Sequence, residues 1–297
     1  MELRQLEYFV AVCEELHFTK AAEKLNISQP SLSQQIRILE HNIGQPLFDR
    51  IGKKTIITES GHILLKHCYN VFHELAQARA AITELQGLTR GLLKIGAIHS
   101  VMNDLLPPAI LSFHQSFPQV ELSLFGLRNG DIIHKLIHNE LDLGIIYYPA
   151  LHQELMVTYL YDVRLAIAVL ENHPLANFTE VKLEHLHNLP LIALQKTYYL
   201  REYMDQVYKD SDIIPHVVME LNNLDSIISM VEQGAGVTVL PFPYLQTLKQ
   251  AAIRVIPFAD PKLTIQIGIA YRRNKYLCTA SKVFMEQILG SALNRKR

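Results

Sequence analysis

The spacing of apolar residues changes near residue 90, and this change divides the chain into parts that must fold differently. From the N-terminus to about Gln86, apolar residues recur every three or four positions, which is the period of amphipathic helices. Beyond Arg90-Gly91, short apolar runs such as Leu143–Tyr147 and Val237–Leu240 alternate with helical stretches. Strands that alternate with helices predict α/β units around a largely parallel sheet. We therefore expect an all-α N-terminal part and an α/β C-terminal part.

Composition excludes several classes of protein. The 297 residues are 49% apolar and 19% charged, which allows packed cores and excludes wholesale disorder. The longest apolar runs are far shorter than the ~18 residues of a membrane span, and no signal-peptide pattern opens the sequence. Three widely spaced cysteines, Cys13, Cys68 and Cys278, indicate reduced thiols, so we expect a cytoplasmic protein without a membrane partner. The net charge of −1 does not point to nucleic acid, so such a partner has to be argued locally.

A short helix, a tight turn and a longer helix are predicted between residues 18 and 43. Ser28 is suited to cap the longer helix, and Pro30 fits its first turn. The residues expected to face inward are Leu32, Ile36, Leu39 and Ile43, while the opposite face and leading end carry Gln29, Ser31, Ser33, Gln34, Arg37 and His41. Gln and Arg can make paired hydrogen bonds to base edges in the major groove of DNA. The pattern predicts a DNA-reading helix, with a three-helix core and an ordinary solvated face as the alternative.

The next segment, residues 46–58, predicts a two-stranded wing with its turn at Ile51–Lys54. Arg50, Lys53 and Lys54 place positive charge in and beside this turn. Basic side chains on a wing can bind the DNA backbone or enter the minor groove. The wing therefore supports the DNA-binding interpretation of the preceding helix.

Four sequence blocks occur here in the order and spacing of one known family. They are Phe18-Thr-Lys-Ala-Ala22, Ser28-Gln-Pro-Ser31, Gln34-Gln-Ile-Arg-x-Leu-Glu40 and Leu47-Phe-x-Arg50. With them, residues 1–58 resemble the winged helix-turn-helix of LysR-type transcriptional regulators. The resemblance implies a regulator that binds double-stranded promoter DNA at inverted-repeat sites. The DNA-binding residues that we predict are Thr19, Lys20, Ser28, Gln29, Pro30, Ser31, Ser33, Gln34, Arg37, Arg50, Lys53 and Lys54.

A long helix is predicted over residues 59–90, with Thr58 as its N-cap and no proline within it. Apolar residues follow a rhythm of threes and fours along it, and a long helix with one apolar stripe needs a partner. It can pack on its own chain, whereas the family resemblance implies a dimer of such helices that joins two DNA-binding domains. The dimerisation residues that we predict are Leu65, Phe72, Leu75 and Ile82, in a dimer or a tetramer.

Residues 91–297 resemble the effector domain of the same family, a periplasmic-binding-protein-like pair of α/β lobes. The matching blocks are Gly91-x-Leu-x-Ile-Gly96, Leu105-Leu-Pro107, Phe117-Pro118, Leu141-Asp-Leu-Gly144, His173-Pro174-Leu175 and Glu232-Gln-Gly-Ala-Gly-Val-Thr-Val-Leu-Pro241. The domains that we expect are a DNA-binding domain (1–58), a linker helix (59–90) and an effector-binding domain (91–297), with lobe I over 91–162 and 268–297 and lobe II over 163–267. Ligands of such folds bind at the C-terminal ends of strands and the N-termini of helices.

Three segments are expected to meet in that cleft, since each follows a predicted strand. They are His99–Met102, Arg128-Asn129-Gly130 and Gln195–Tyr198. Hydroxyl and N–H donors in the first segment, together with the cations Arg128 and Lys196, favour a small organic anion. The resemblance places Ser100 and Thr197 at the effector. The effector-binding residues that we predict are His99, Ser100, Val101, Met102, Arg128, Asn129, Tyr147, Lys196, Thr197 and Tyr198; the alternatives are plain caps and turns, an apolar or cationic ligand, or no ligand.

No constellation of residues predicts an enzyme, a metal site or a cofactor. His134 and His138 share one helical face, but Lys135 stands where a metalloprotease motif has Glu, and no third ligand is evident. Gly234-Ala-Gly236 lacks the third glycine of a dinucleotide-binding motif. The rival interpretations are a soluble solute-binding protein, which needs a signal peptide, and an enzyme on the same two-lobed fold. Neither rival explains the helix-turn-helix segment.

Overall fold

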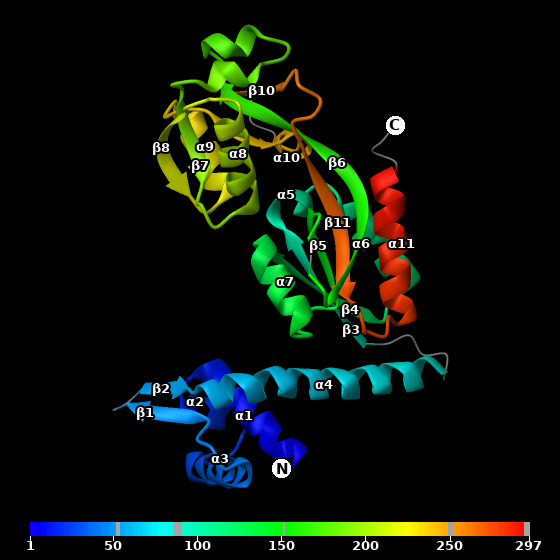
Figure 1. Cartoon of the computed structure of the whole chain (residues 1–297). Coiled ribbons are helices and arrows are strands. Elements are labelled where there is room, and N and C mark those ends of the chain that lie inside the picture. The colour runs from blue at the N-terminus through cyan, green and yellow to red at the C-terminus, as the bar shows by residue number, and fades with distance from the viewer. Residues whose placement is uncertain (52–53, 86–90, 151, 249–251, 294–297) are drawn as a thin grey trace. The chain divides into compact units, whose positions relative to one another are not determined.

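The computed structural model describes residues 1–51, 54–85, 91–150, 152–248 and 252–293. The chain divides into two compact units, Met1–Ala81 and Ile82–Arg297. The first unit consists of helices and a β-hairpin, and the second is built on a mixed sheet (Figure 1). One long helix, α4 (Glu59–Leu85), continues across the boundary between the units. In the part of the chain that is described, no helix is long and apolar enough to cross a membrane.

The core of the first unit is formed by the helices α1 (Leu3–Glu15), α2 (Phe18–Lys24) and α3 (Gln29–Ile43). The predicted cap of α3 is confirmed, because the Ser31 N–H donates to Ser28 Oγ at 3.3 Å. The inward residues Leu32, Ile36 and Leu39 are fully buried, as predicted. The prediction for Ile43 is wrong: this residue ends α3, where the helix leaves the core, and it is 37% exposed.

The predicted wing is an antiparallel hairpin of β1 (Phe48–Ile51) and β2 (Lys54–Ile57). Glu40 of α3 fixes its start, because Oε1 accepts hydrogen bonds from the backbone N–H groups of Leu47 (2.8 Å) and Phe48 (3.3 Å). The ring of Phe48 packs on Phe9 and Phe18, with centroid distances of 5.3 and 5.7 Å. Polar and apolar contacts together attach the wing to the helical core.

Helix α4 begins at the predicted cap, since the Gly61 N–H donates to Thr58 Oγ1 at 3.0 Å. Gly61 lies so close to the chain before the wing that a Cβ atom there would be 2.4 Å from the carbonyl oxygen of Leu47. About two turns further on, Cys68 is 1% exposed, and Phe72 packs partly on the same core. The first half of α4 is therefore part of the first unit.

In the described part of the second unit, seven strands form one sheet: β3 (Gly91–Ile98), β4 (Val120–Leu127), β5 (Leu143–Tyr148), β6 (Leu155–Leu170), β9 (Thr238–Pro241), β10 (Ile253–Pro257) and β11 (Thr264–Arg272). Their order is β10-β6-β11-β5-β3-β4, with β9 also beside β6. A separate parallel pair is formed by β7 (Pro190–Leu194) and β8 (His216–Leu221). In the larger sheet β3 pairs in parallel with β4 and β5, but every pair made by β6 or β11 is antiparallel. The expected largely parallel sheet is therefore wrong for this part.

The strand β11 runs beside the first part of β6, from Leu155 to Arg164, and β6 continues beyond it (Figure 1). β11 lies beside β5 near one end, whereas β6 carries β9 and β10 near the other. The register between them shifts between Ile267 and Gly268. The lobe boundary expected between residues 267 and 268 falls at this irregularity. Lobe I denotes residues 91–162 and 268–297, and lobe II denotes residues 163–267. The division into these two lobes stays a prediction.

Helices cover both sides of the strands. In lobe I they are α5 (His99–Met102), α6 (Leu106–Ser116), α7 (Asn129–Ile137) and α11 (Thr279–Leu293); in lobe II they are α8 (Tyr199–Asp210), α9 (Leu224–Glu232) and α10 (Phe242–Gln246), with short 3-10 turns at Pro174–Asn177 and Leu183–Leu186. α6 packs on α11 through the fully buried rings of Phe113 and Phe284, 5.4 Å apart. α7 lies on the other side of the strands (Figure 1). This layering leaves the helix N-termini beside the strand ends free to line a cavity.

Candidate functional site

One face of α3 presents polar side chains to solvent. The exposed residues among those predicted to bind DNA are Gln29, Ser31, Gln34 and Arg37 on α3, Ser28 and Pro30 at its start, and Thr19 and Lys20 at the start of α2. Because Leu32, Ile36 and Leu39 hold the opposite face of α3 in the core, the polar face is fixed outward. The predicted DNA-reading residues of α2 and α3 therefore lie on an accessible surface, apart from Ser33.

The expectation that Ser33 lies on the exposed face of α3 is wrong, and its contact with DNA stays a prediction. The side chain is only 9% exposed, and Oγ accepts a hydrogen bond from Gln29 Nε2 at 2.8 Å. Residues four positions apart lie above one another on a helix, so Gln29 covers Ser33. Ser33 orients the amide of Gln29 rather than offering a free hydroxyl.

The basic residues of the wing are placed only in part. Arg50 pairs with Thr55 along the hairpin, and Lys54 pairs with Ile51. The side chains of Arg50 and Lys54, and Lys53 as a whole, lie outside the described residues. DNA contacts by these three residues therefore stay a prediction.

The apolar stripe predicted along α4 divides into two. Leu65 and Phe72 are half-buried against the core of the first unit, so their assignment to a dimer seam loses its support. Leu75 and Ile82 are 39% and 59% exposed, and Val71, which the sequence analysis missed, is 39% exposed. Val71, Leu75 and Ile82 are spaced by four and seven positions, as in helices that pair along a heptad seam. Val71, Leu75 and Ile82 therefore form one apolar stripe that the second half of α4 leaves uncovered, apart from the exposed Ile63 near its start; we call this stripe the α4 seam.

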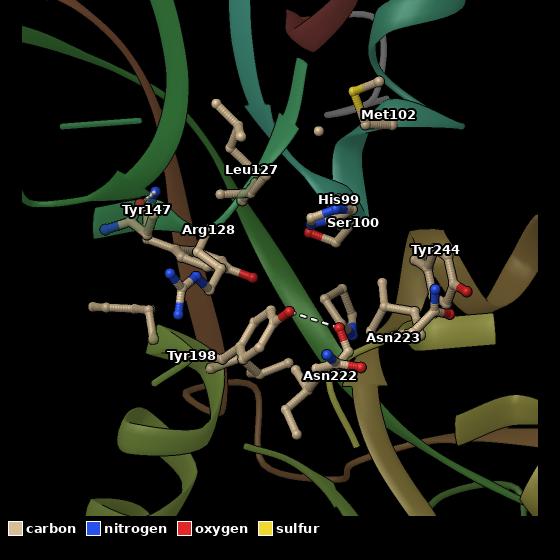
Figure 2. Close-up of a pocket in the computed structure, with 18 of the residues that line it drawn as sticks. His99, Ser100, Met102, Leu127, Arg128, Tyr147, Tyr198, Asn222, Asn223 and Tyr244 are labelled. Carbon is tan, nitrogen blue, oxygen red and sulfur yellow. Dashed lines mark hydrogen bonds between the residues drawn. The ribbon is translucent and has the colours of Figure 1, made fainter. Parts of the chain in front are cut away.

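A cavity of about 270 Å³ opens in the second unit, where four helices begin (Figure 2). α5 follows β3, α7 follows β4, α8 follows β7 and α9 follows β8. His99, Arg128, Tyr198 and Asn223 line it, and each lies at the start of one of these helices. Parallel strands end at the same edge, so the helices that follow them converge there. This cavity is the predicted cleft, since its walls come from both lobe I and lobe II.

Ser100 contributes a buried hydroxyl to the cleft. It is 8% exposed, and among the described residues its Oγ has no hydrogen-bond partner. Burial raises the pKa of the neighbouring Tyr147 to about 12, and the nearby Ser100 hydroxyl opposes this rise. Tyr147 is therefore a neutral phenol near neutral pH, and it lies beside the Ser100 hydroxyl. A buried, unsatisfied hydroxyl in a cavity wall indicates a site for a polar ligand group.

The start of α7 supplies further donors. Asn129 Oδ1 accepts the Tyr147 backbone N–H at 2.9 Å, which leaves the Nδ2 amide to donate. Arg128 forms two hydrogen bonds to Asp131, of 2.8 and 3.2 Å, so its positive charge is already paired. α7 has nine residues and α5 only four, so the field of a helix N-terminus comes mainly from α7.

The facing wall carries amides and a carboxylate. The Tyr198 hydroxyl donates to the carbonyl of Asn222 at 2.6 Å (Figure 2). Asn223 caps α9, because its Oδ1 accepts two backbone N–H groups of the first turn, at 2.8 and 3.1 Å. The buried Tyr244 hydroxyl donates to Asp225 Oδ1 at 3.2 Å. This wall therefore presents hydrogen-bond acceptors and one fixed carboxylate.

Seven of the predicted effector residues line the cleft: His99, Ser100, Met102, Arg128, Asn129, Tyr147 and Tyr198. Val101, Lys196 and Thr197 do not line this cavity, so the expectation that they face the cleft is wrong. Val101 is 3% exposed and belongs to the hydrophobic core, because α5 turns it away from the cavity. Lys196 and Thr197 are exposed in the turn before α8 and do not line the cavity.

Sequence reasoning missed several lining residues, among them Tyr199, Asn222, Asn223, Asp225 and Tyr244. Asn222-Asn223 follow β8 and precede the apolar helix α9, which is the same strand-to-helix pattern that identified the other segments. That signal was available for the two asparagines and for Asp225. Tyr244 lies on the short helix α10 and carried no comparable signal.

In the described part of the chain, no group of three or more His, Cys, Asp or Glu side chains is placed to hold a metal ion. His134 and His138 lie on one face of α7 with their rings stacked at 4.1 Å. His138 Nδ1 is 2.8 Å from the carbonyl oxygen of His134. This contact within one helix accounts for the arrangement of the pair.

An outward polar helix in a winged helix-turn-helix, joined through one long helix to a domain with a ligand cleft, defines a ligand-responsive DNA-binding regulator. Residues 3–62 match the family model for bacterial regulatory helix-turn-helix proteins of the lysR family, and residues 86–292 match the LysR substrate binding domain. The chain belongs to the LysR family of DNA-binding transcriptional regulators, whose members carry a C-terminal effector-binding domain.

Several characterised proteins are similar over almost their whole length. The HTH-type transcriptional regulator AlsR of Bacillus subtilis is 33% identical over 278 residues, which are 93% of this chain and 92% of AlsR. The dual regulator OxyR of Escherichia coli is 29% identical over 273 residues, 92% of this chain and 90% of OxyR. A full-length OxyR variant from Pseudomonas aeruginosa has a similar structure, with a TM-score of 0.76, 30% identity, and coverage of 97% and 98% of the two chains.

Proposed function

We propose that this chain is a homo-oligomeric transcription factor that reads promoter DNA with α3 and the wing, and that responds to a small metabolite with an anionic group in the cleft. The observation that carries the ligand assignment is Ser100, a hydroxyl 8% exposed in the cavity wall with no partner among the described residues. Several donors must act together, since one helix N-terminus contributes only about 0.3–1 kcal/mol toward an exposed anion.

Self-association of the chain is proposed to run through the α4 seam. Inverted-repeat DNA is read by two copies of a recognition helix, so the two-fold symmetry of a dimer matches that of the site. The seam leaves Leu75 and Ile82 39% and 59% exposed in the single chain, and a second α4 would cover them. Two linked DNA-binding domains also gain affinity by avidity.

We further propose that the chain has no catalytic activity and acts in the cytoplasm, where promoter DNA is accessible. The relatives named above are transcriptional regulators. A solute-binding protein remains the alternative for the second unit taken alone, because such proteins also hold small ligands between two lobes. The helix-turn-helix in the first unit favours the regulator.

DNA reading is tested with Arg37→Ala in a mobility-shift assay on the DNA upstream of the gene. Arg37 is exposed on the outward face of α3, where a lost base contact costs about 1–3 kcal/mol of specific binding. Arg4→Ala on α1 is the control, since it removes the same charge from an exposed residue outside that face. Unchanged operator preference in Arg37→Ala would show that α3 does not read bases.

Ligand binding is tested by a thermal-shift screen of small carboxylates and phosphates on the full chain. A ligand at 100 times its Kd adds about 2.7 kcal/mol of apparent stability. Ser100→Ala is expected to reduce this response while DNA binding without ligand stays intact, because Ser100 lies in the second unit. An equal response in the parent protein and Ser100→Ala would remove Ser100 from the site.

A further inference from the structure

Two formal charges line the cleft, and only one of them is paired within the protein. Arg128 is bound to Asp131 through two hydrogen bonds, whereas Asp225 forms no salt bridge with any described residue. Counting His99 as neutral, the charge that remains for a ligand to meet is the carboxylate of Asp225. A ligand that is only an anion would therefore meet an unpaired like charge, which opposes binding.

The carboxylate of Asp225 is held in place. Its backbone N–H donates to Asn223 Oδ1 at 2.8 Å, and the Tyr244 hydroxyl donates to its Oδ1 at 3.2 Å. Tyr244 is only 2% exposed, so this hydroxyl approaches from the protein interior. An acidic residue in the first turn of α9 also interacts favourably with the helix dipole, which explains a carboxylate here without any ligand. The side chain is nevertheless exposed at the cavity, so a ligand in the cleft can reach it.

The middle and the opposite side of the cleft offer donors instead. Ser100 has an unpartnered hydroxyl, the Nδ2 amide of Asn129 is left to donate, and the nine-residue helix α7 begins there. In the view of Figure 2, Arg128 and Tyr147 lie on one side of the pocket and Tyr244 on the other, with His99 and Ser100 between them. Donors and the unpaired carboxylate thus occupy different parts of one small cavity.

We propose that the effector is a small zwitterion of amino-acid type, with its anionic group at Ser100, Asn129 and the start of α7 and its ammonium group at Asp225. This inference rests on the proposed function of the cleft as the effector site. An ammonium group pairs the exposed carboxylate of Asp225, and a carboxylate satisfies the buried Ser100 hydroxyl. The volume of about 270 Å³ is slightly below the range of pockets for drug-sized ligands, which suits a molecule of this size.

The expected discrimination is between molecules of one carbon skeleton that differ in charge. Simple carboxylates place a negative group in the same cavity as Asp225, and simple amines leave the donors at Ser100 and Asn129 without an acceptor. Both mismatches weaken the binding of the wrong ligand. Weakening the competitors is an effective source of specificity.

The experiment uses the full chain in thermal-shift assays and calorimetry with the common amino acids, each beside its deaminated acid and its decarboxylated amine. Leucine, 4-methylpentanoate and 3-methylbutylamine form one such set, and phenylalanine, 3-phenylpropanoate and phenethylamine another. At least one amino acid is expected to bind at least tenfold more tightly than both of its analogues. If no amino acid binds, or if the deaminated acids bind as tightly, the zwitterion proposal is overturned.

Two variants locate the charges. Asp225→Asn keeps the shape and still accepts the Tyr244 hydroxyl, so it should bring the affinities of the amino acid and its deaminated acid to within about twofold of each other. Ser100→Ala should weaken both compounds in parallel. Glu202→Gln is the control, because it also removes an acid from the first turn of a helix, α8, but lies outside the cleft lining. A preference that survives Asp225→Asn overturns the role of Asp225.

The zwitterion and the effector site fail under different results. If carboxylates bind in a manner that depends on Ser100 and show no preference for an ammonium group, the cleft remains an effector site and only the zwitterion is wrong. If no charged compound binds and Ser100→Ala changes nothing, the proposed function of the cleft fails with it.

Discussion

Glu40 controls the start of the wing through a single carboxylate oxygen. Oε1 accepts the backbone N–H groups of Leu47 and Phe48, and Leu47 is fully buried. Leaving a buried N–H group without an acceptor costs about 1–3 kcal/mol. We expect Glu40→Ala to lower the free energy of unfolding of the first unit by about that amount per lost bond, as measured by urea denaturation.

The control for this prediction is Glu7→Ala, which removes an exposed carboxylate from α1. It should change the stability by less than about 0.5 kcal/mol, as surface substitutions usually do. Glu40→Gln, which keeps an acceptor oxygen, should fall between the two. Equal stability of Glu40→Ala and Glu7→Ala would mean that the two hydrogen bonds do not anchor the wing.

At the scale of single residues, sequence patterns predicted which segments reach the site but not which side chains face it. Ser33 and Thr197 both have the right chemistry at the right spacing. Gln29 covers the first, and the second lies in a turn that carries it to solvent. Asp225 was missed because an acid in a first turn looks like ordinary helix capping until the cavity beside it is known.

Helix α4 shows how one element can serve two partners. Its first half packs on the first unit through Cys68 and Phe72, and the α4 seam of Val71, Leu75 and Ile82 points elsewhere. A period of three and four residues cannot separate two such faces, because both repeat along the same helix. The sequence therefore predicted one stripe where the structure has two.

Leu75→Asp tests the seam at the scale of the element. A charge in an apolar helix pair is left without a partner, so the oligomer should dissociate and half-site binding should weaken. Light scattering on the purified protein measures the change of mass. Phe72 is less suitable for this test, since it also packs on the core of the first unit and its loss would destabilise that unit.

Ala76→Asp is the matched control for Leu75→Asp. It adds the same charge to an exposed position of α4, about a third of a helical turn away from the seam. This variant should keep the mass of the parent protein. If both variants keep the parent mass, the α4 seam does not join two chains.

The other elements illustrate why some predictions succeeded. α3, its cap and the wing were predicted because Ser28, Pro30 and the inward apolar residues act locally. The direction of β6 and β11 was not predicted, because the sequence of a buried apolar strand is the same whether the strand pairs in parallel or antiparallel. Only the contacts between residues far apart in the sequence, such as Arg272 with Leu155, decide that they are antiparallel.

For the whole molecule, the cleft matters only if its occupancy changes how the two lobes sit against each other. One direct contact between them is the stack of Tyr147, on β5, against Tyr199, at the start of α8, with ring centroids 4.6 Å apart. Both rings line the cleft. A ligand can shift an equilibrium between lobe arrangements only by binding one arrangement better than the other. This stack favours one arrangement before any ligand is present.

Tyr199→Ala should therefore weaken the coupling between ligand and DNA. Aromatic pairs contribute about 0.5–1.5 kcal/mol beyond their buried area. Coupling free energies between two sites of allosteric proteins are about 1–3 kcal/mol. Losing the stack therefore removes a free energy of the same order as the coupling. The measured quantity is the ratio of operator affinities with and without the ligand, from fluorescence anisotropy. Tyr199→Phe keeps the ring and should keep the ratio, whereas Tyr199→Ala should bring it toward one.

Because linkage is reciprocal, DNA should also change ligand affinity less in Tyr199→Ala. Equal ratios in both variants would show that the stack takes no part in the response.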